Sequence, residues 1–427
     1  MKKTIFALFA AAAIMVGCNK TPKVQTYNVT ANFKVGTEAL TTSGLAVSLT
    51  GDNTTLTAQT DGNGTAKFEN IAEGNYVISM SASIIVEGYS VVYNGSKNIA
   101  VAGADVTVDV ELTESMTSQL IIKELYCGGC QKDDASGFYA DDKYITIYNN
   151  SAGDADASEL VIGLIGPSTA GGTNKYYNAE TKKLAYEDED WLPAYSAIWW
   201  LKGNDKVTIP PYSEITIAIY GAIDHTATFK NSVNLNKAEY YWMSNDGVEK
   251  FTATKYQKSE IIPASHYFTT IPISMGNSWV MANMNPGVFI AQMSKTEVTA
   301  LSSNTEAFDK TLGTSITCAK FPRENVLDAI EVFDQSSVEK SIARFTKDIN
   351  SGYIALTTYQ GHTLYRNVDK AATEAIAENV GKLVTGYKAD PSGIDAEASI
   401  KAGAKIVYMD TNNSGNDFHE REKAAIK

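Results

Sequence analysis

Cys127 and Cys130, which are separated by two glycines, form the sharpest chemical motif in this 427-residue chain. A Cys-x-x-Cys pair acts in redox catalysis when the first sulfur sits at a helix N-terminus, where its pKa falls. Residues 131–137 include two aspartates and do not begin a convincing helix, so the motif favours a structural disulfide. Unbridged thiols, or pairing with Cys318, are the alternatives. We expect a Cys127–Cys130 bridge, with Cys318 buried and unreactive.

Acidic residues and histidines give weaker candidates for metal binding and acid–base chemistry. The run Asp410–Gly415 follows the opening of a calcium-binding loop, but Arg421 stands at the position of the closing acid, so a turn is favoured. His419 begins a zinc-protease pattern in which Lys423 replaces the second histidine. The sequence therefore predicts no metal site, no cofactor and no catalytic residue, and we expect that the protein is not an enzyme.

One aromatic cluster is a candidate for ligand stacking. It consists of Trp191, Tyr195, Trp199 and Trp200. Exposed tryptophan and tyrosine rings stack on sugars or other flat ligands. Core packing is the alternative, because Ile198 precedes the last two tryptophans.

Composition and charge restrict the class of protein. With 44% hydrophobic residues the chain is too apolar to be disordered. Its formal net charge of −13 argues against a nucleic-acid partner, which would require a basic face.

The N-terminus carries the pattern of an export signal. Lys2 and Lys3 precede a short apolar run over residues 5–14, which is too short to remain as a membrane span. Val16-Gly17-Cys18 resembles a bacterial lipobox, whose cysteine is acylated after cleavage. We therefore predict a signal peptide over 1–17 and lipidation of Cys18, with residues 18–26 forming the anchor and tether.

This resemblance implies a membrane partner and a location in the cell envelope, on the outer membrane. Surface-exported lipoproteins of the Bacteroidetes type often carry acidic residues just after the cysteine, whereas this chain has none over 19–23. Both the periplasmic and the surface-facing leaflet therefore stay open.

The elements that must position these residues are mainly β-strands. Apolar and polar residues alternate over 27–35 and again over 106–112, which indicates strands with one face in a core. Shorter strand-like runs lie between them, at 45–49, 56–59, 65–68, 76–82 and 91–99. Seven short strands within 27–113 predict an immunoglobulin-like β-sandwich, in which Asp61–Gly64 forms a tight hairpin turn.

The segments Thr60–Phe68 and Gly74–Ile78 resemble the transthyretin-like, or carboxypeptidase-regulatory-like, fold. In that family a turn and a strand are followed by a Gly-x-Tyr that enters the next strand. The resemblance implies a spacer or a stabilising module rather than a catalyst.

A polar linker over 114–119 precedes a larger β domain over 120–427. The strands expected at 120–126 and 142–151 resemble the opening of a lamin-tail-like domain, and 207–219 and 328–333 resemble its later strands. Long insertions at 168–193 and 224–263 depart from a compact lamin tail. Two short helices are expected at 369–381 and 395–403.

As a whole, 120–427 is similar to a family of uncharacterised Bacteroidetes-type lipoproteins with a domain of unknown function, which implies no established activity. We expect a non-catalytic cell-envelope lipoprotein that acts as a binding or structural module beside another envelope protein. The alternative is a lipoprotein that captures a small molecule, metal complex or glycan for an outer-membrane transporter. An extracytoplasmic hydrolase is the least favoured.

Overall fold

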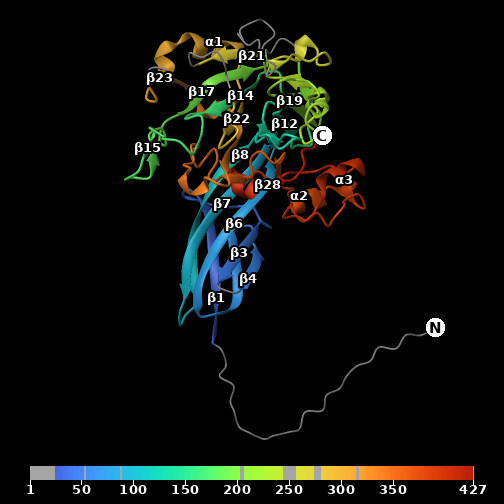
Figure 1. The fold of residues 1–427 in the computed structure, drawn as a ribbon. Helices are drawn as coiled ribbons and strands as arrows, with labels where there is room; N and C mark the ends of the chain where they lie inside the picture. The colour runs from blue at the N-terminus through green and yellow to red at the C-terminus, as the bar shows by residue number, and fades with distance from the viewer. Residues whose placement is uncertain are drawn as a thin grey trace, which may run out of the picture. The chain divides into compact units, whose positions relative to one another are not determined.

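The computed structural model divides into two compact units (Figure 1). Unit 1 runs to Met80 and includes Gly95–Thr113, and unit 2 comprises Ser81–Asn94 and Glu114–Lys427. The residues described are 25–51, 54–86, 89–201, 206–243, 256–273, 280–313 and 317–426.

The predicted domain limits, 27–113 and 120–427, stay predictions. Residues 81–94, which the sequence placed in the first domain, group with unit 2. The predicted signal peptide, Cys18 and most of the tether lie outside the described residues.

The N-terminal strands form one eight-stranded sheet in the order β2-β1-β8-β7-β6-β3-β4, with β5 also paired to β1. Along β1, Val29, Ala31 and Phe33 are fully buried, which confirms the predicted alternation. All seven expected strands are present. The bounds are β1 (Thr26–Val35), β2 (Glu38–Ala39), β3 (Ala46–Gly51), β4 (Thr54–Gln59), β5 (Thr65–Ala72), β6 (Gly74–Val86), β7 (Tyr89–Val101) and β8 (Val106–Thr117).

The turn at Asp61–Gly64 is formed, but the hairpin prediction is wrong. The turn joins β4, which pairs with β3, to β5, which pairs with β1, so it connects strands that do not pair with each other. The Asp61 carboxylate accepts the N–H groups of Asn63 and Thr65, each at 2.9 Å. Gly64 has φ +70°, and a Cβ there would lie 2.4 Å from the Leu40 carbonyl oxygen.

Unit 2 contains two large sheets, here called sheet I and sheet II. Sheet I has the order β20 (Tyr240–Tyr241), β19 (Glu214–Ala218), β12 (Tyr144–Asn149), β9 (Leu120–Tyr126), β27 (Thr363–Arg366), β28 (Phe418–Arg421). Sheet II has the order β23 (Phe308–Asp309), β24 (Cys318–Pro322), β17 (Trp191–Trp200), β14 (Leu160–Ile165), β22 (Gly287–Gln292), β25 (Val326–Asp334), β26 (Ile354–Leu356), and β21 (Thr269–Pro272) also pairs with β17.

Three small two-stranded ribbons accompany the large sheets. They are β10 (Cys130–Gln131) with β11 (Phe138–Tyr139), β13 (Ala155–Asp156) with β18 (Thr208–Ile209), and β15 (Tyr177–Asn178) with β16 (Lys183–Leu184).

The two large sheets are buried on both faces. One face of each contributes to a shared core, which contains Ile122 of sheet I and Ile162 of sheet II. The neighbouring residue in each strand points the other way, because side chains alternate across a strand. Ile121 therefore packs in a second core, and Val161 in a third.

Short helices complete unit 2. They are α1 (Lys295–Ser303), α2 (Lys370–Ala375), α3 (Ala396–Lys401) and α4 (Ser414–Asp417). The predicted helices at 369–381 and 395–403 are confirmed as α2 and α3, each beginning after an aspartate that caps its first turn. No helix in the described part of the chain is long and apolar enough to cross a membrane. The mainly β fold class is thus confirmed, whereas the lamin-tail likeness stays a prediction.

A substitution at Gly163 tests how closely sheet II is packed. It pairs directly with Phe289 of β22, and a Cβ at Gly163 would lie 2.1 Å from the phenyl ring. Because overpacking a core costs about 1–3 kcal/mol, we expect Gly163→Ala to lower the free energy of unfolding by that amount. Denaturant unfolding followed by tryptophan fluorescence measures it, since all five tryptophans lie in unit 2.

Gly153→Ala is the matched control, because a Cβ added there would lie 3.8 Å from the Gln119 amide, which is an ordinary contact distance. Equal unfolding midpoints for the two variants would show that the Phe289 ring moves aside without loss of stability.

Candidate functional site: a buried arginine with three carboxylates

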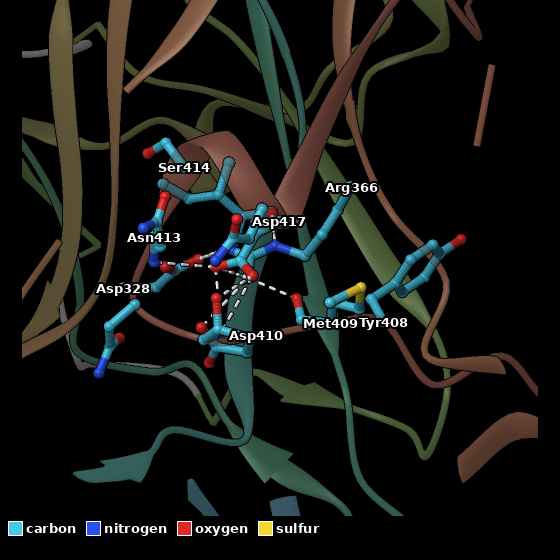
Figure 2. Close-up of polar contacts among 12 residues, drawn as sticks. Asp328, Arg366, Tyr408, Met409, Asp410, Asn413, Ser414 and Asp417 are labelled. Carbon is cyan, nitrogen blue, oxygen red and sulfur yellow. Dashed lines mark hydrogen bonds and ion pairs between the residues drawn. The ribbon is translucent and has the colours of Figure 1, made fainter. Parts of the chain in front are cut away.

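Arg366, at the end of β27, is a fully buried cation inside unit 2 (Figure 2). Its guanidinium forms an ion pair with Asp328, and its Nη1 lies 3.2 Å from Asp410 Oδ1 and 3.8 Å from Asp417 Oδ2. The same group packs over the Phe418 ring, 4.6 Å from its centroid. One guanidinium on β27 therefore faces three carboxylates, one from β25 and two from the segment 409–417.

Arg366 and Asp328 also complete the backbone hydrogen bonding of β9. Strand β27 pairs with β9 only at Leu125 and Glu124, so the register leaves Ile122 beyond its end. There Arg366 Nε donates to the Ile122 carbonyl oxygen at 2.7 Å, and the Asp328 carboxylate accepts the Ile122 N–H at 2.7 Å. Since Asp328 lies on β25, this contact joins sheet II to sheet I.

The third segment is the loop 409–417, whose opening follows a calcium-binding pattern in the sequence. Asp417 accepts hydrogen bonds from Thr411 N–H at 3.0 Å and from Asn413 N–H at 3.2 Å, so it closes the loop on itself. Arg366 Nη1 donates to the Met409 carbonyl oxygen at 2.8 Å (Figure 2). A guanidinium thus occupies the position beside the acids that a bound cation would need.

Burial decides the protonation of this cluster. It raises the pKa of Asp328 to about 7 and that of Asp417 to about 6, with the Asp410 charge adding to both effects. Arg366 opposes these shifts, and the carboxylates raise its own pKa in return. The arrangement joins strands and a loop by charge, and it offers no solvent-facing acid or base.

A second buried ion pair lies on the same strand β25. Glu331 and Arg344 have no exposed side-chain surface, and the guanidinium contacts the carboxylate through both Nε and Nη2. The remaining Arg344 donors reach the carbonyl oxygens of Pro167 at 2.6 Å and Asn285 at 2.9 Å. This pair fixes the loop around Arg344 against sheet II.

The predicted Cys127–Cys130 bridge is not formed in the structure, where all three described cysteines are buried thiols. The glycines serve close approach instead of closing a disulfide loop. Gly129 has φ +71°, and a Cβ there would lie 2.2 Å from the Tyr139 carbonyl oxygen. Burial raises the pKa values of Cys127 and Cys318 to about 12, so neither thiol ionises near neutral pH. The expected burial of Cys318 is confirmed.

The aromatic cluster lies along β17 and belongs mostly to the core. The Trp199 ring stacks on Trp242 with 3.7 Å between centroids, and Trp200 donates to the Met293 carbonyl oxygen. The stacking role is therefore wrong for Trp199 and Trp200, which are buried. Trp191 and Tyr195 are half-buried, and for them the role stays a prediction.

Two of the histidines are held by neighbouring groups. His419 is buried beside Arg421, and both effects lower its pKa to about 3. His362 Nδ1 lies 2.7 Å from the Glu420 carboxylate in a half-exposed pair. Among the described residues, no group of three or more histidine, cysteine, aspartate and glutamate side chains is placed to hold a metal ion.

Sequence reasoning missed Arg366, Arg344, Asp417 and the charges on β25. A usable signal was present, because Asp328 and Glu331 interrupt the apolar run over 326–333. Charged residues are rarely buried without partners, so two acids in a core strand imply two buried cations. Which arginines supply them depends on contacts between residues far apart in sequence.

Residues 210–425, just over half of the chain, match the model of the DUF4876 family, which is described as proteins of unknown function. The chain therefore belongs to the DUF4876 family. No curated protein sequence matches it.

Solved structures agree with this family. A DUF4876 family protein from Bacteroides thetaiotaomicron is 20% identical, with a TM-score of 0.54 over 94% of this chain and 96% of that chain. At this identity the likeness shows the fold alone.

Two other solved structures align with smaller parts of the chain at low TM-scores. A putative carbohydrate binding protein from Pseudomonas aeruginosa is 16% identical over 22% of this chain and 92% of its own, with a TM-score of 0.17. A DUF3823 family protein from Parabacteroides merdae is 13% identical over 43% and 94%, with a TM-score of 0.18. Scores this low carry no argument about fold or function.

Removing the buried cation should destabilise unit 2 strongly. We expect Arg366→Ala to lower the free energy of unfolding by roughly 3–5 kcal/mol, because it leaves buried carboxylates without their partner. Lys405→Ala is the control, since Lys405 pairs at 3.0 Å with an exposed Glu378 and such pairs contribute roughly 0–1 kcal/mol. Denaturant titration followed by tryptophan fluorescence compares the two, and similar losses would refute a structural role for Arg366.

The raised pKa of Asp417 gives a pH dependence with a definite sign. The folded chain binds this proton more tightly than the unfolded chain, so the stability it contributes is present below about pH 4 and is lost as pH rises through about 6. Asp417→Asn cannot ionise. The unfolding temperature of the variant minus that of the native chain should therefore increase as pH rises from 5 to 7.5.

Other titrating groups, His419 among them, are present in both chains, so much of their effect cancels in this comparison. A constant difference in unfolding temperature across the pH range would contradict the raised pKa.

Proposed function

We propose that this protein is a lipid-anchored cell-envelope protein that acts without catalysis, as a binding or structural module. The anchor rests on the lipobox-like Val16-Gly17-Cys18 behind an export signal. Lipidation at Cys18 would place both units outside the inner membrane, with outer-membrane attachment as the expected site.

The observation that carries the non-catalytic role is how the reactive side chains are used. Arg366 and Arg344 neutralise buried carboxylates, and those contacts hold strands and loops together. The thiols of Cys127 and Cys318 are buried with raised pKa values. Groups that serve packing in this way are not poised to attack or protonate a substrate.

Ligand capture for an outer-membrane transporter is the second candidate. One observation favours it: a lysine-rimmed hollow of about 530 Å³ lies on unit 2 of an otherwise acidic chain. Its volume falls within the usual range for small-molecule sites.

Substitution of Cys18 tests the anchor. We expect Cys18→Ser to abolish acylation, because serine does not provide the sulfur that the lipid modification uses. Cells grown with a labelled fatty acid should incorporate label into the native chain, found in the membrane fraction, and none into the variant. Cys127→Ser, in the buried motif, is the matched control for loss of a thiol and should keep its label. Equal label in the native and Cys18→Ser chains would refute the lipobox assignment.

A further inference from the structure

The hollow on unit 2 lies between the β15–β16 ribbon and the irregular segment 341–351. The ribbon stands out from the side of the unit (Figure 1). Three lysines line the hollow, Lys182 and Lys183 from the ribbon and Lys347 from the opposite segment, against one carboxylate, Glu187.

Two of these lysines are available to a ligand. Lys183 lies 3.7 Å from Asp188, whereas no carboxylate of the described chain pairs with Lys182 or Lys347, and both are exposed. Lys182 also has φ +60°, a backbone conformation that lysine rarely adopts. With three lysines against one carboxylate in its lining, the hollow favours an anion, and the charge of −13 on the chain makes this local excess distinctive.

The lining of the hollow also includes apolar and aromatic side chains. Phe345 and Leu184 are buried, and Tyr177 is half-buried. Such a surface suits a ring whose flat face carries C–H groups, while the lysines contact its charged substituents.

An extended peptide is disfavoured as the ligand, because four main-chain donors on the two walls already have partners. Ile342 N–H donates to Ala170 at 3.1 Å, and Ser351 N–H donates to Asn412 at 2.6 Å. On the ribbon, Lys182 N–H donates to Asn178 at 2.9 Å, and Leu184 N–H donates to Glu187 at 3.2 Å. Added β-pairing at these four positions is therefore blocked, which favours recognition through side chains.

We propose that this hollow binds an acidic oligosaccharide, with sugar-ring carboxylates contacting Lys182 and Lys347 and one ring face against Tyr177. The inference rests on the proposed non-catalytic binding role and gives that role a site and a ligand class. The attraction is electrostatic, so binding weakens as salt increases.

Calorimetric titration of the full chain with tri-galacturonic acid tests the proposal, with a neutral trisaccharide, inorganic phosphate and tetraglutamate as comparison probes. We expect binding of the acidic trisaccharide alone, and at least about tenfold weaker binding by a Lys182→Glu/Lys347→Glu chain. A Lys295→Glu/Lys310→Glu chain is the matched control, since it makes the same charge change at exposed sites away from the hollow and should bind within about twofold of native. Tyr177→Ala should weaken binding without changing its salt dependence.

Several results would overturn the proposal. Equal weakening by both lysine pairs would leave only a general charge effect, and no binding of the acidic trisaccharide at millimolar concentration would remove the ligand class. Equal affinity for tetraglutamate would assign an acidic peptide instead. Chromatography of the titrated sample distinguishes failure of the binding site from failure of the proposed function. Shortened sugar products would refute the non-catalytic role and leave the site in place.

Discussion

The folded state of unit 2 depends on Arg366, a cation with no exposed surface that contacts both sheets and the loop 409–417. Strand pairing between β27 and β9 stops short of Ile122, and the side chains of Arg366 and Asp328 supply the hydrogen bonds that a further strand residue would make. Buried backbone groups must be satisfied, so the cluster is part of the sheet architecture. Glu331 and Arg344 repeat the arrangement on the same strand.

The buried charges explain why the loop 409–417, which opens like a calcium-binding loop, has a structural role instead. Acids at Asp410 and Asp417 converge as in a cation site, but the cation is a side chain of the same protein. Other reactive groups are packed inside as well, namely the three described cysteines and the side chains of Trp199 and Trp200. Functional contact with other molecules is thereby left to the surface, where the lysine-rimmed hollow lies.

Local periodicity was enough to predict much of the fold. The alternation along 27–35 and the Asp-to-Gly helix over 395–403 both appear as expected, because each is set by neighbours in sequence. The turn at Asp61–Gly64 was located correctly, but its partners were not, because pairing depends on contacts distant in sequence. For Trp199 both ligand stacking and core packing stay open in the sequence, because the local pattern does not show which face of β17 is covered. The partner of Asp328 was missed because Arg366 is distant from it in sequence.

Thermal unfolding of the full chain in calcium and in a chelator tests most directly whether the buried charges are internally satisfied. Tryptophan fluorescence reports unit 2, where all five tryptophans lie. If Arg366 is the cation of the cluster, the unfolding temperature should be the same with millimolar calcium and with the chelator. A calcium-dependent rise that disappears in Asp410→Asn would contradict the account, because the loop would then hold a metal ion that Arg366 does not replace.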